Sequence, residues 1–213
     1  MMKKILLILI VSFILIGCVP LNEMTINEII EANINNNVNI ANQHRRGYKY
    51  FLPRGMNIVQ VKDFNEVAKS NEGYYYLYFD LVSYFNEVRQ EYKINPNAYF
   101  SMAINNGDSF GYLEINRLNE KYLIEIMYNY AKIEVIVGEK DIRQAVHNAV
   151  VILSTTRYND KVLANFMGNN TLRFGEYEFN IFETRNNVES SYLTAIDAEG
   201  HSDEENHDTD LIR

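Results

Sequence analysis

The sequence predicts an α+β domain in which an antiparallel meander of about four or more strands packs against one or two helices. Three observations predict it: apolar segments of strand length between residues 98 and 137, an Asn-Gly pair between the first two, and a helical pattern of apolar residues directly after them. Strands followed by segregated helices are typical of the α+β class. With 213 residues, 47% of them hydrophobic, the chain is long enough for one such domain with a substantial core.

The composition argues against several function classes. A single cysteine excludes an intramolecular disulfide framework and any multi-cysteine metal site. A net charge of −8 argues against a nucleic-acid partner, because nucleic-acid binding depends on clustered Lys and Arg. The zinc-protease pattern His-Glu-x-x-His and the Gly-rich phosphate-binding loops are also missing from the sequence. We therefore expect a protein that is not an enzyme and that holds no metal.

The first eighteen residues have the features of an export signal. Lys3 and Lys4 provide a short positive start, and residues 5–16 are apolar apart from Ser12. A helix over that run is only about 18 Å long, short of the ~30 Å hydrocarbon core of a bilayer, so it is typical of a signal peptide rather than a membrane span. The next residues are more specific, because the run Leu-Ile-Gly-Cys at 15–18 resembles the lipobox of bacterial lipoproteins.

The resemblance implies a lipid-anchored protein with a signal peptide over residues 1–17. Cleavage would fall between Gly17 and Cys18, and a diacylglycerol would be attached covalently to the Cys18 sulfur. The resemblance also leaves open acylation of the new N-terminus, and it implies no other cofactor. The chain would then lie at the cell membrane, facing outside the cytoplasm, with the membrane as one partner. Two competing interpretations are a short uncleaved anchor with an incidental cysteine, and cleavage by the ordinary secretory peptidase. The second lacks a small-x-small site before Cys18.

Residues 18–47 are predicted to be a tether that contains a short amphipathic helix. Thr25 and Glu28 have capping-box spacing, and four isoleucines then share one helical face: Ile26, Ile29, Ile30 and Ile34. Asparagines between residues 33 and 42 weaken this helix, which favours a flexible spacer after it. The apolar stripe can dock on the domain or lie on the bilayer, and docking is the interpretation we prefer.

A single domain is predicted over residues 48–196. In its first half, strands are expected at residues 48–52, 57–62 and 74–79, with a turn at 53–55 and a brief helix from 63 to about 69. Helical spacing of apolar residues predicts a further helix over 81–93, with one long strand as the competing interpretation.

The second half of the domain has the clearest pattern. Strands are expected at residues 98–104, 110–116, 122–128 and 133–137, the first two joined by a hairpin turn at Asn106-Gly107. Glu139 and Asp141 suit the first turn of a helix that lies across one face of the sheet. A helix near 160–167 and a strand at 177–182 complete the domain. Residues 197–213 are rich in Asp and Glu, and we expect an acidic disordered tail there.

Three glutamates form the best candidate site for a ligand. If their apolar neighbours face the core, Glu114, Glu125 and Glu134 share the opposite face of adjacent strands. Strands ~4.8 Å apart bring such carboxylates close enough for a cation site or an acid–base pair. The interpretation we prefer is an ordinary solvated face, on which Lys121 and Lys132 offset the negative charge.

The remaining candidates are weaker. His147 lies away from the apolar stripe of its helix, which predicts a surface residue. Tyrosines are abundant, with four of them between residues 74 and 78, and such a surface suits a protein partner or a sugar. We expect binding or assembly at the cell envelope, with an envelope protein as partner. The alternatives are a small-ligand or cation-binding accessory lipoprotein and, third, an envelope enzyme.

Overall fold

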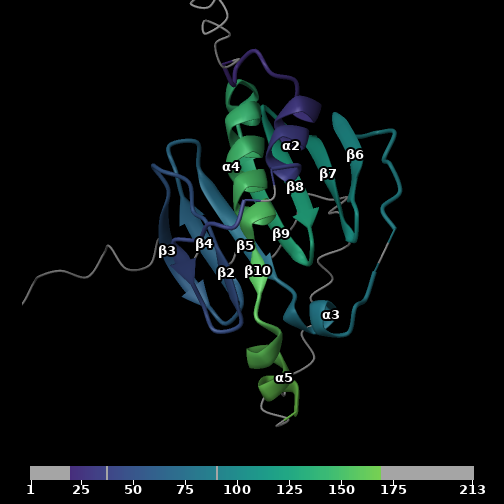
Figure 1. Ribbon diagram of the computed structural model, residues 1–213. Coiled ribbons are helices and arrows are strands. Elements are labelled where there is room, and N and C mark those ends of the chain that lie inside the picture. The colour runs from purple at the N-terminus through teal and green to yellow at the C-terminus, as the bar shows by residue number, and fades with distance from the viewer. Residues whose placement is uncertain (1–19, 37, 90, 169–213) are drawn as a thin grey trace, which may run out of the picture. The chain divides into compact units, whose positions relative to one another are not determined.

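The computed structural model describes residues 20–36, 38–89 and 91–168 (Figure 1). Gly17 and Cys18 lie outside the described residues, as do the strand expected at 177–182 and the acidic tail expected at 197–213. Within the described part of the chain, no helix is both long enough and apolar enough to cross a bilayer.

The main element is a seven-stranded sheet in which every neighbouring pair is antiparallel. In spatial order it contains β3 (Asn57–Lys62), β4 (Asn65–Lys69), β5 (Tyr74–Phe79), β9 (Ala131–Val137), β8 (Lys121–Tyr128), β7 (Ser109–Leu118) and β6 (Phe100–Asn106). The sheet thus consists of two meanders, β3–β5 and β6–β9, joined by the β5–β9 pair. A small second sheet has the order β1 (Gln43–His44), β2 (Tyr48–Tyr50) and β10 (Arg157–Tyr158).

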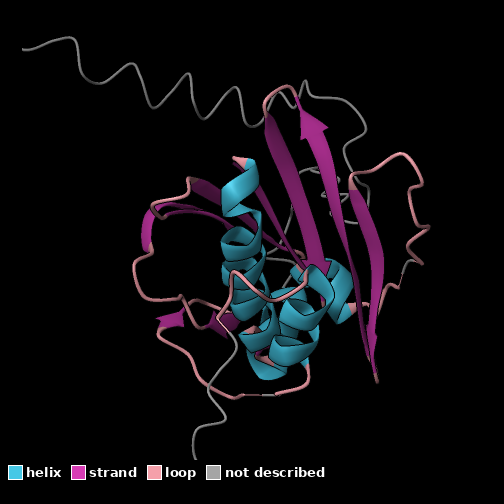
Figure 2. Cartoon of the chain, turned by 90° about the horizontal axis from the view of Figure 1, so that it is seen from above, coloured by secondary structure: helices cyan, strands magenta, loops and turns pink. Residues whose placement is uncertain are grey.

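The helices lie on one face of the large sheet or at one of its ends (Figures 1 and 2). They are α2 (Ile26–Ile34), α3 (Leu81–Phe85), α4 (Ile142–Thr155) and α5 (Asp160–Gly168), with a 3₁₀ turn, η1 (Glu139–Asp141), directly before α4. The longest helix, α4, packs on β8 and β9, and α2 packs on α4. The predicted α+β fold, with an antiparallel meander against helices, is therefore confirmed.

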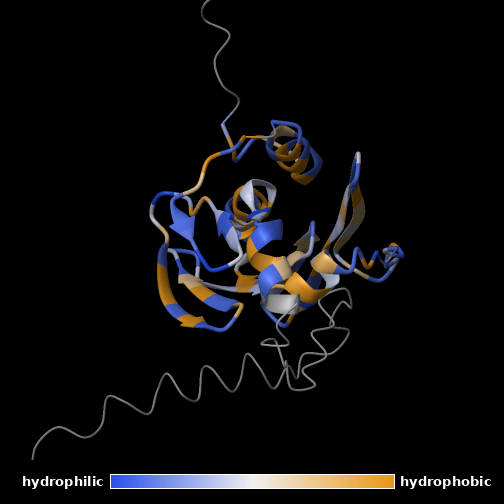
Figure 3. Ribbon diagram, turned by 60° about the horizontal axis from the view of Figure 1, so that its bottom comes forward, coloured by the Kyte–Doolittle hydropathy of each residue, from blue (hydrophilic) through white to orange (hydrophobic). Residues whose placement is uncertain are grey.

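The core lies between α4 and the sheet. Hydrophobic and hydrophilic residues alternate along the strands, and each helix has one hydrophobic side (Figure 3). On α4, Ala145 and Ala149 are fully buried and allow close approach to the sheet, while Val146 and Leu153 fill the space beside them. Each fully buried Val or Leu side chain contributes about 1.5–3 kcal/mol relative to an exposed one.

The brief helix expected from residue 63 is wrong, because residues 65–69 form strand β4. Asp63 has a positive φ of 54° and, with Phe64, makes a tight turn between the paired residues Lys62 and Asn65. β4 then pairs with β3 on one side and β5 on the other. Two ladders of backbone hydrogen bonds outweigh the weak local preference for a helix start.

The helix expected over residues 81–93 ends much earlier, at Phe85. Glu87 has a φ of 54°, and its amide donates to the Tyr84 carbonyl, while the Val88 amide donates to the Ser83 carbonyl. This pair of bonds is a Schellman motif, which stops a helix by turning the chain to the left-handed region.

Much of the expected tether is packed into the fold. The capping box of Thr25 and Glu28 is present, and the isoleucine stripe of α2 is buried, so docking on the domain is confirmed. Strand β1 pairs with β2. The side chain of Asn42 accepts from the Leu52 amide (2.7 Å) and donates to the Leu52 carbonyl (2.8 Å), so it replaces a backbone partner. Asn42 thus helps to anchor the segment after the helix.

Candidate functional site

The three predicted glutamates lie side by side in one row across the sheet. Glu125 on β8 pairs with Glu114 on β7 and with Glu134 on β9, so the expectation that they share a face is confirmed. Their neighbours Ile115, Ile124 and Val135 belong to the core on the helix side. The glutamates are only 0–1% exposed, however, and the solvated face that we preferred is therefore wrong.

Lys132 provides the positive charge within this row. Its Nζ atom lies 2.9 Å from Glu125 Oε1 and 3.0 Å from Glu134 Oε1, and the side chain is only 3% exposed. Of the two lysines expected to offset the charge, Lys132 does so, whereas Lys121 is exposed. The Lys132 ammonium thus occupies the position between the two carboxylates where a bound cation would have to lie. Within the described ranges, no group of three or more His, Cys, Asp or Glu has the arrangement of a metal site.

Glu114, at the other end of the row, holds the chain segment that precedes β6. Its carboxylate accepts from Asn95 Nδ2 (2.9 Å), from Asn116 Nδ2 (2.8 Å) and from the Tyr92 hydroxyl. The Tyr92 ring stacks on Tyr112, with 4.5 Å between the ring centroids. A buried charged acceptor with several donors fastens this loop to the sheet.

Burial explains the protonation of the tyrosines in this region. Burial, together with the hydrogen bond to Glu114, raises the pKa of Tyr92 to about 12. Burial also raises the pKa of Tyr112 well above its usual value, and the negative charge of Glu125 adds to the effect. Both tyrosine hydroxyls therefore stay protonated at neutral pH, and the Tyr92 hydroxyl remains a hydrogen-bond donor.

A further buried acid, Glu66, is not among the residues that the sequence predicted for a site. On β4, it accepts from the hydroxyls of Tyr48 (2.9 Å) and Tyr50 (2.8 Å) and from the Arg45 guanidinium (2.7 Å). These donors belong to the small sheet and its β1–β2 connection, so the Glu66 cluster (Glu66, Arg45, Tyr48 and Tyr50) joins the small sheet to the large one. One sequence signal could have indicated this cluster. Tyr48 and Tyr50 lie on the same face of a strand, and a buried tyrosine hydroxyl needs a polar partner.

The expectation that the sequence holds no catalytic motif is wrong in one respect: Gly107-Asp108-Ser109-Phe110-Gly111 has the Gly-x-Ser-x-Gly spacing of a hydrolase nucleophile elbow. That motif places its serine on a turn from a strand into a helix. Here the turn is the β6–β7 hairpin: Asn106 pairs with Ser109, and Gly107 has a φ of 58°. The hairpin prediction is confirmed, with the turn centred one residue later than expected, and the motif lacks its catalytic context. Gly111 is required by packing, since an added Cβ would lie 2.0 Å from the Met127 carbonyl oxygen.

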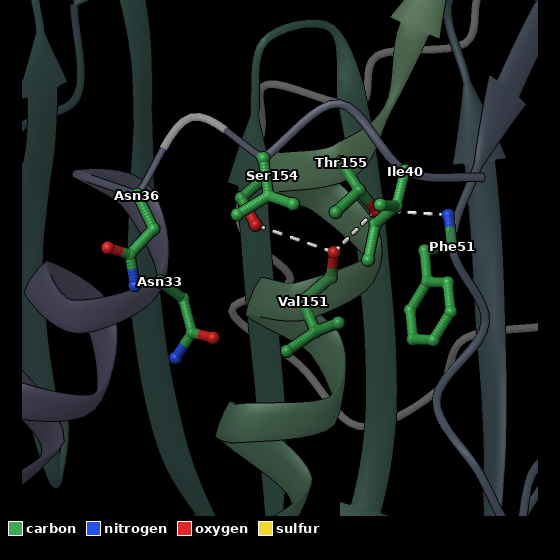
Figure 4. A pocket seen from close by; sticks show the side chains of 8 residues that line it. Asn33, Asn36, Ile40, Phe51, Val151, Ser154 and Thr155 are labelled. Carbon is green, nitrogen blue, oxygen red and sulfur yellow. Dashed lines mark hydrogen bonds between the residues drawn. The ribbon is translucent and has the colours of Figure 1, made fainter.

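A pocket of about 140 Å³ lies between the C-terminal parts of α2 and α4 (Figure 4). Exposed Val38 and Ile40 form part of its lining. Its polar groups are used within the chain: the Thr155 hydroxyl donates to the Val151 carbonyl (2.7 Å) and accepts from the Phe51 amide (3.0 Å). Its walls are mainly apolar, and its size suits only a small ligand.

The other sequence candidates are mostly part of the packing. Tyr75, Tyr76 and Tyr78 are buried and only Tyr74 of that run is exposed, so the run is not an open interaction surface. His147 is half-buried rather than at the surface, because its ring faces α2, with 3.4 Å between its Nδ1 atom and Asn33 Nδ2. Burial lowers the pKa of His147.

Comparison of the chain with protein-family models, with curated proteins and with solved structures gave no match. A fold class by itself does not determine function, because one architecture supports many activities. Function is therefore inferred from the residues of the chain itself.

Proposed function

We propose that this chain is a bacterial lipoprotein, anchored to the cell membrane through a diacylglycerol on Cys18 and facing outside the cytoplasm. Its α+β domain acts in binding or assembly at the envelope and performs no chemistry of its own. The observation that carries the proposal is the lipobox-like run at residues 15–18 after a positive start and a short apolar segment. A thioether-linked diacylglycerol provides two acyl chains, which is enough for a lasting anchor.

The chemistry of the buried acids gives them a structural role. Glu66, Glu114 and Glu125 each accept hydrogen bonds or ion pairs from side chains of the same chain, at distances close to 3 Å or less. A general acid or base must instead lie within hydrogen-bond distance of the substrate atom to which it transfers a proton or from which it takes one. Acids held in this way stabilise the fold.

Strand β3 supports a protein partner. It lies at the edge of the large sheet, and Val59 and Val61 on it are 53% and 50% exposed. An edge strand with exposed apolar residues is able to accept a further strand from another protein.

The anchor is tested by replacing Cys18 with Ser in the full-length protein in bacterial cells. We expect unprocessed precursor and no incorporation of labelled fatty acid, because serine has no thiol for the thioether. The control is Ser12→Ala, which keeps the apolar run and should leave labelling unchanged. Fatty-acid labelling that survives in the Cys18→Ser variant would disprove the lipobox assignment.

The binding role is tested by crosslinking in intact cells with the paired substitutions Val59→Lys and Val61→Lys. We expect loss of one envelope protein from the crosslinked products, while the matched control Val82→Lys, at another exposed valine on α3, retains it. Turnover of an envelope substrate by the purified domain, lost on changing Glu125 or Glu134 in variants that keep the wild-type circular dichroism, would instead establish the enzyme alternative.

The second candidate function is a small-ligand or cation-binding accessory lipoprotein. The pocket between α2 and α4 favours the small ligand over the cation, because no acidic side chain lines it. A ligand that binds only the native state raises the melting temperature. Thermal-shift measurements with divalent cations and short glycans separate the two proposals: a shift that Val151→Phe removes by filling the pocket favours the ligand-binding role, and unchanged melting favours the protein partner.

A further inference from the structure

The described part of the chain begins at Pro20, two residues after the proposed lipidation site. The Glu23 amide donates to the Pro20 carbonyl (2.9 Å), which forms a turn before α2. Leu21 and Met24 pack against the core. Arg143 on α4 donates from Nε to the Met24 carbonyl (2.9 Å) and so fixes the turn to the start of the longest helix.

This spacing leaves almost no free chain between the lipid and the domain. A fully extended chain spans at most about 3.6 Å per residue, so Cys18 lies within about 11 Å of Leu21 and within about 22 Å of Met24. A diacylglycerol on the Cys18 sulfur would sit at the headgroup boundary. Leu21 must then lie within about 11 Å of the headgroups, so this end of the domain is held close to the membrane.

The fold identifies which end of the molecule this is. The turn at residues 20–24 lies beside η1 and the N-terminus of α4, at the top of Figure 1. The 14 residues of α4 extend about 21 Å away from this end at 1.5 Å per residue. At the other end lie α3 and α5, which contact each other through the Tyr84 hydroxyl and Asp160 (2.8 Å).

We infer that the domain lies directly on the lipid headgroups, with the 20–24 turn and the N-terminus of α4 toward the bilayer and α5 away from it. This inference rests on the proposed lipidation of Cys18. The partner of the domain would then be a membrane-embedded protein or a chain held close to the membrane, because the short segment between the lipid and the domain limits its distance from the bilayer. The expected long tether over residues 18–47 would have allowed a much wider reach.

The charges at this end indicate that the anchor, not electrostatic adsorption, holds the domain there. Exposed Lys140 and Arg143 are accompanied by exposed Glu23 and Glu139. A basic patch draws a protein to anionic lipid and releases it in salt. Because this surface carries both positive and negative charges, we expect the orientation of the domain to be insensitive to ionic strength.

The test uses the full-length lipidated protein in vesicles of phosphatidylcholine and phosphatidylglycerol. Lipidation blocks the thiol of the only cysteine, so a new cysteine at Lys140→Cys or Lys161→Cys is labelled alone with a fluorophore. Both lysines are exposed, one at the proposed near end and one on α5. A spin-labelled headgroup lipid then quenches fluorescence at short range.

We expect several-fold stronger quenching at position 140 than at position 161, unchanged at high salt. A flexible spacer of Gly and Ser inserted between Val19 and Pro20 should remove the difference. Equal quenching at the two positions without the spacer would overturn the inference. The mass of the N-terminal peptide, measured on the same sample, reports whether Cys18 carries the lipid, so failure of the proposed anchoring is distinguished from failure of the orientation.

Discussion

Two buried acid clusters in the described part of the chain lie on opposite faces of one sheet and differ in how their charge is balanced. Glu66 faces the helix side, in line with Leu77 and Ile133, and meets Arg45, whose side chain is 23% exposed. Glu125 and Glu134 face the other way and share Lys132, which is only 3% exposed. The Glu66 cluster joins two sheets at their margin, whereas the glutamate row stabilises the middle of one sheet. The deeper ion pair should therefore matter more for stability.

The largest effect is expected for Lys132→Met, which removes the ammonium from two buried carboxylates. Breaking a buried ion pair by removing one partner costs about 3–5 kcal/mol of unfolding free energy. Urea unfolding followed by circular dichroism measures the loss. The exposed Lys121→Met is the matched control and should change stability by no more than about 0.5 kcal/mol. Equal stabilities for the two variants would refute the importance of the deep pair.

An intermediate effect is expected for Glu66→Gln. This change removes the negative charge that accepts hydrogen bonds from Arg45 and two tyrosine hydroxyls. Hydrogen bonds to charged groups contribute about 1.5–3 kcal/mol to the free energy of unfolding. Arg45→Met should cost less, because the arginine is partly in water. A double-mutant cycle with both changes measures their coupling. A cycle with zero coupling energy would show that the ion pair does not hold the two sheets together.

A smaller effect is expected for Tyr92→Phe, which leaves the stacking on Tyr112 and removes one hydrogen bond to Glu114. The expected cost is about 1–2 kcal/mol, with faster amide exchange in the loop before β6. Alkaline pH gives a second measurement. Because the pKa of Tyr92 is raised from 10.0 to about 12 in the fold, its contribution is present below pH 10 and is lost as pH rises through 12. The phenylalanine variant should lose less stability than the wild type over that interval.

The smallest effect is expected for His147 at acidic pH. Burial lowers its pKa from 6.5, so its neutral form is favoured in the fold and stability falls as pH drops below 6.5. His147→Gln cannot take up that proton, and its stability should depend less on pH between 7 and 5. Identical pH dependence in the two proteins would show that the contact between α2 and α4 does not sense the histidine charge.

Strong local patterns made much of the fold predictable. The β6–β9 meander and α4 follow from alternation and helical spacing, and the alternation also placed Glu114, Glu125 and Glu134 on one face. Their burial was not predictable, because alternation reports which face a residue occupies and not what covers that face. Glu66 was hidden by a local helix signal that the ladders on both sides of β4 override. Likewise, the packing of residues 20–47 depends on partners distant in sequence, such as Arg143 and Leu52.

The most direct test of the proposed function is the mass of the N-terminal peptide of the mature protein purified from bacterial membranes. We predict a chain that begins at Cys18 and carries a diacylglycerol on its sulfur. A chain that retains residues 1–17, or one whose Cys18 has a free thiol, would contradict the proposal.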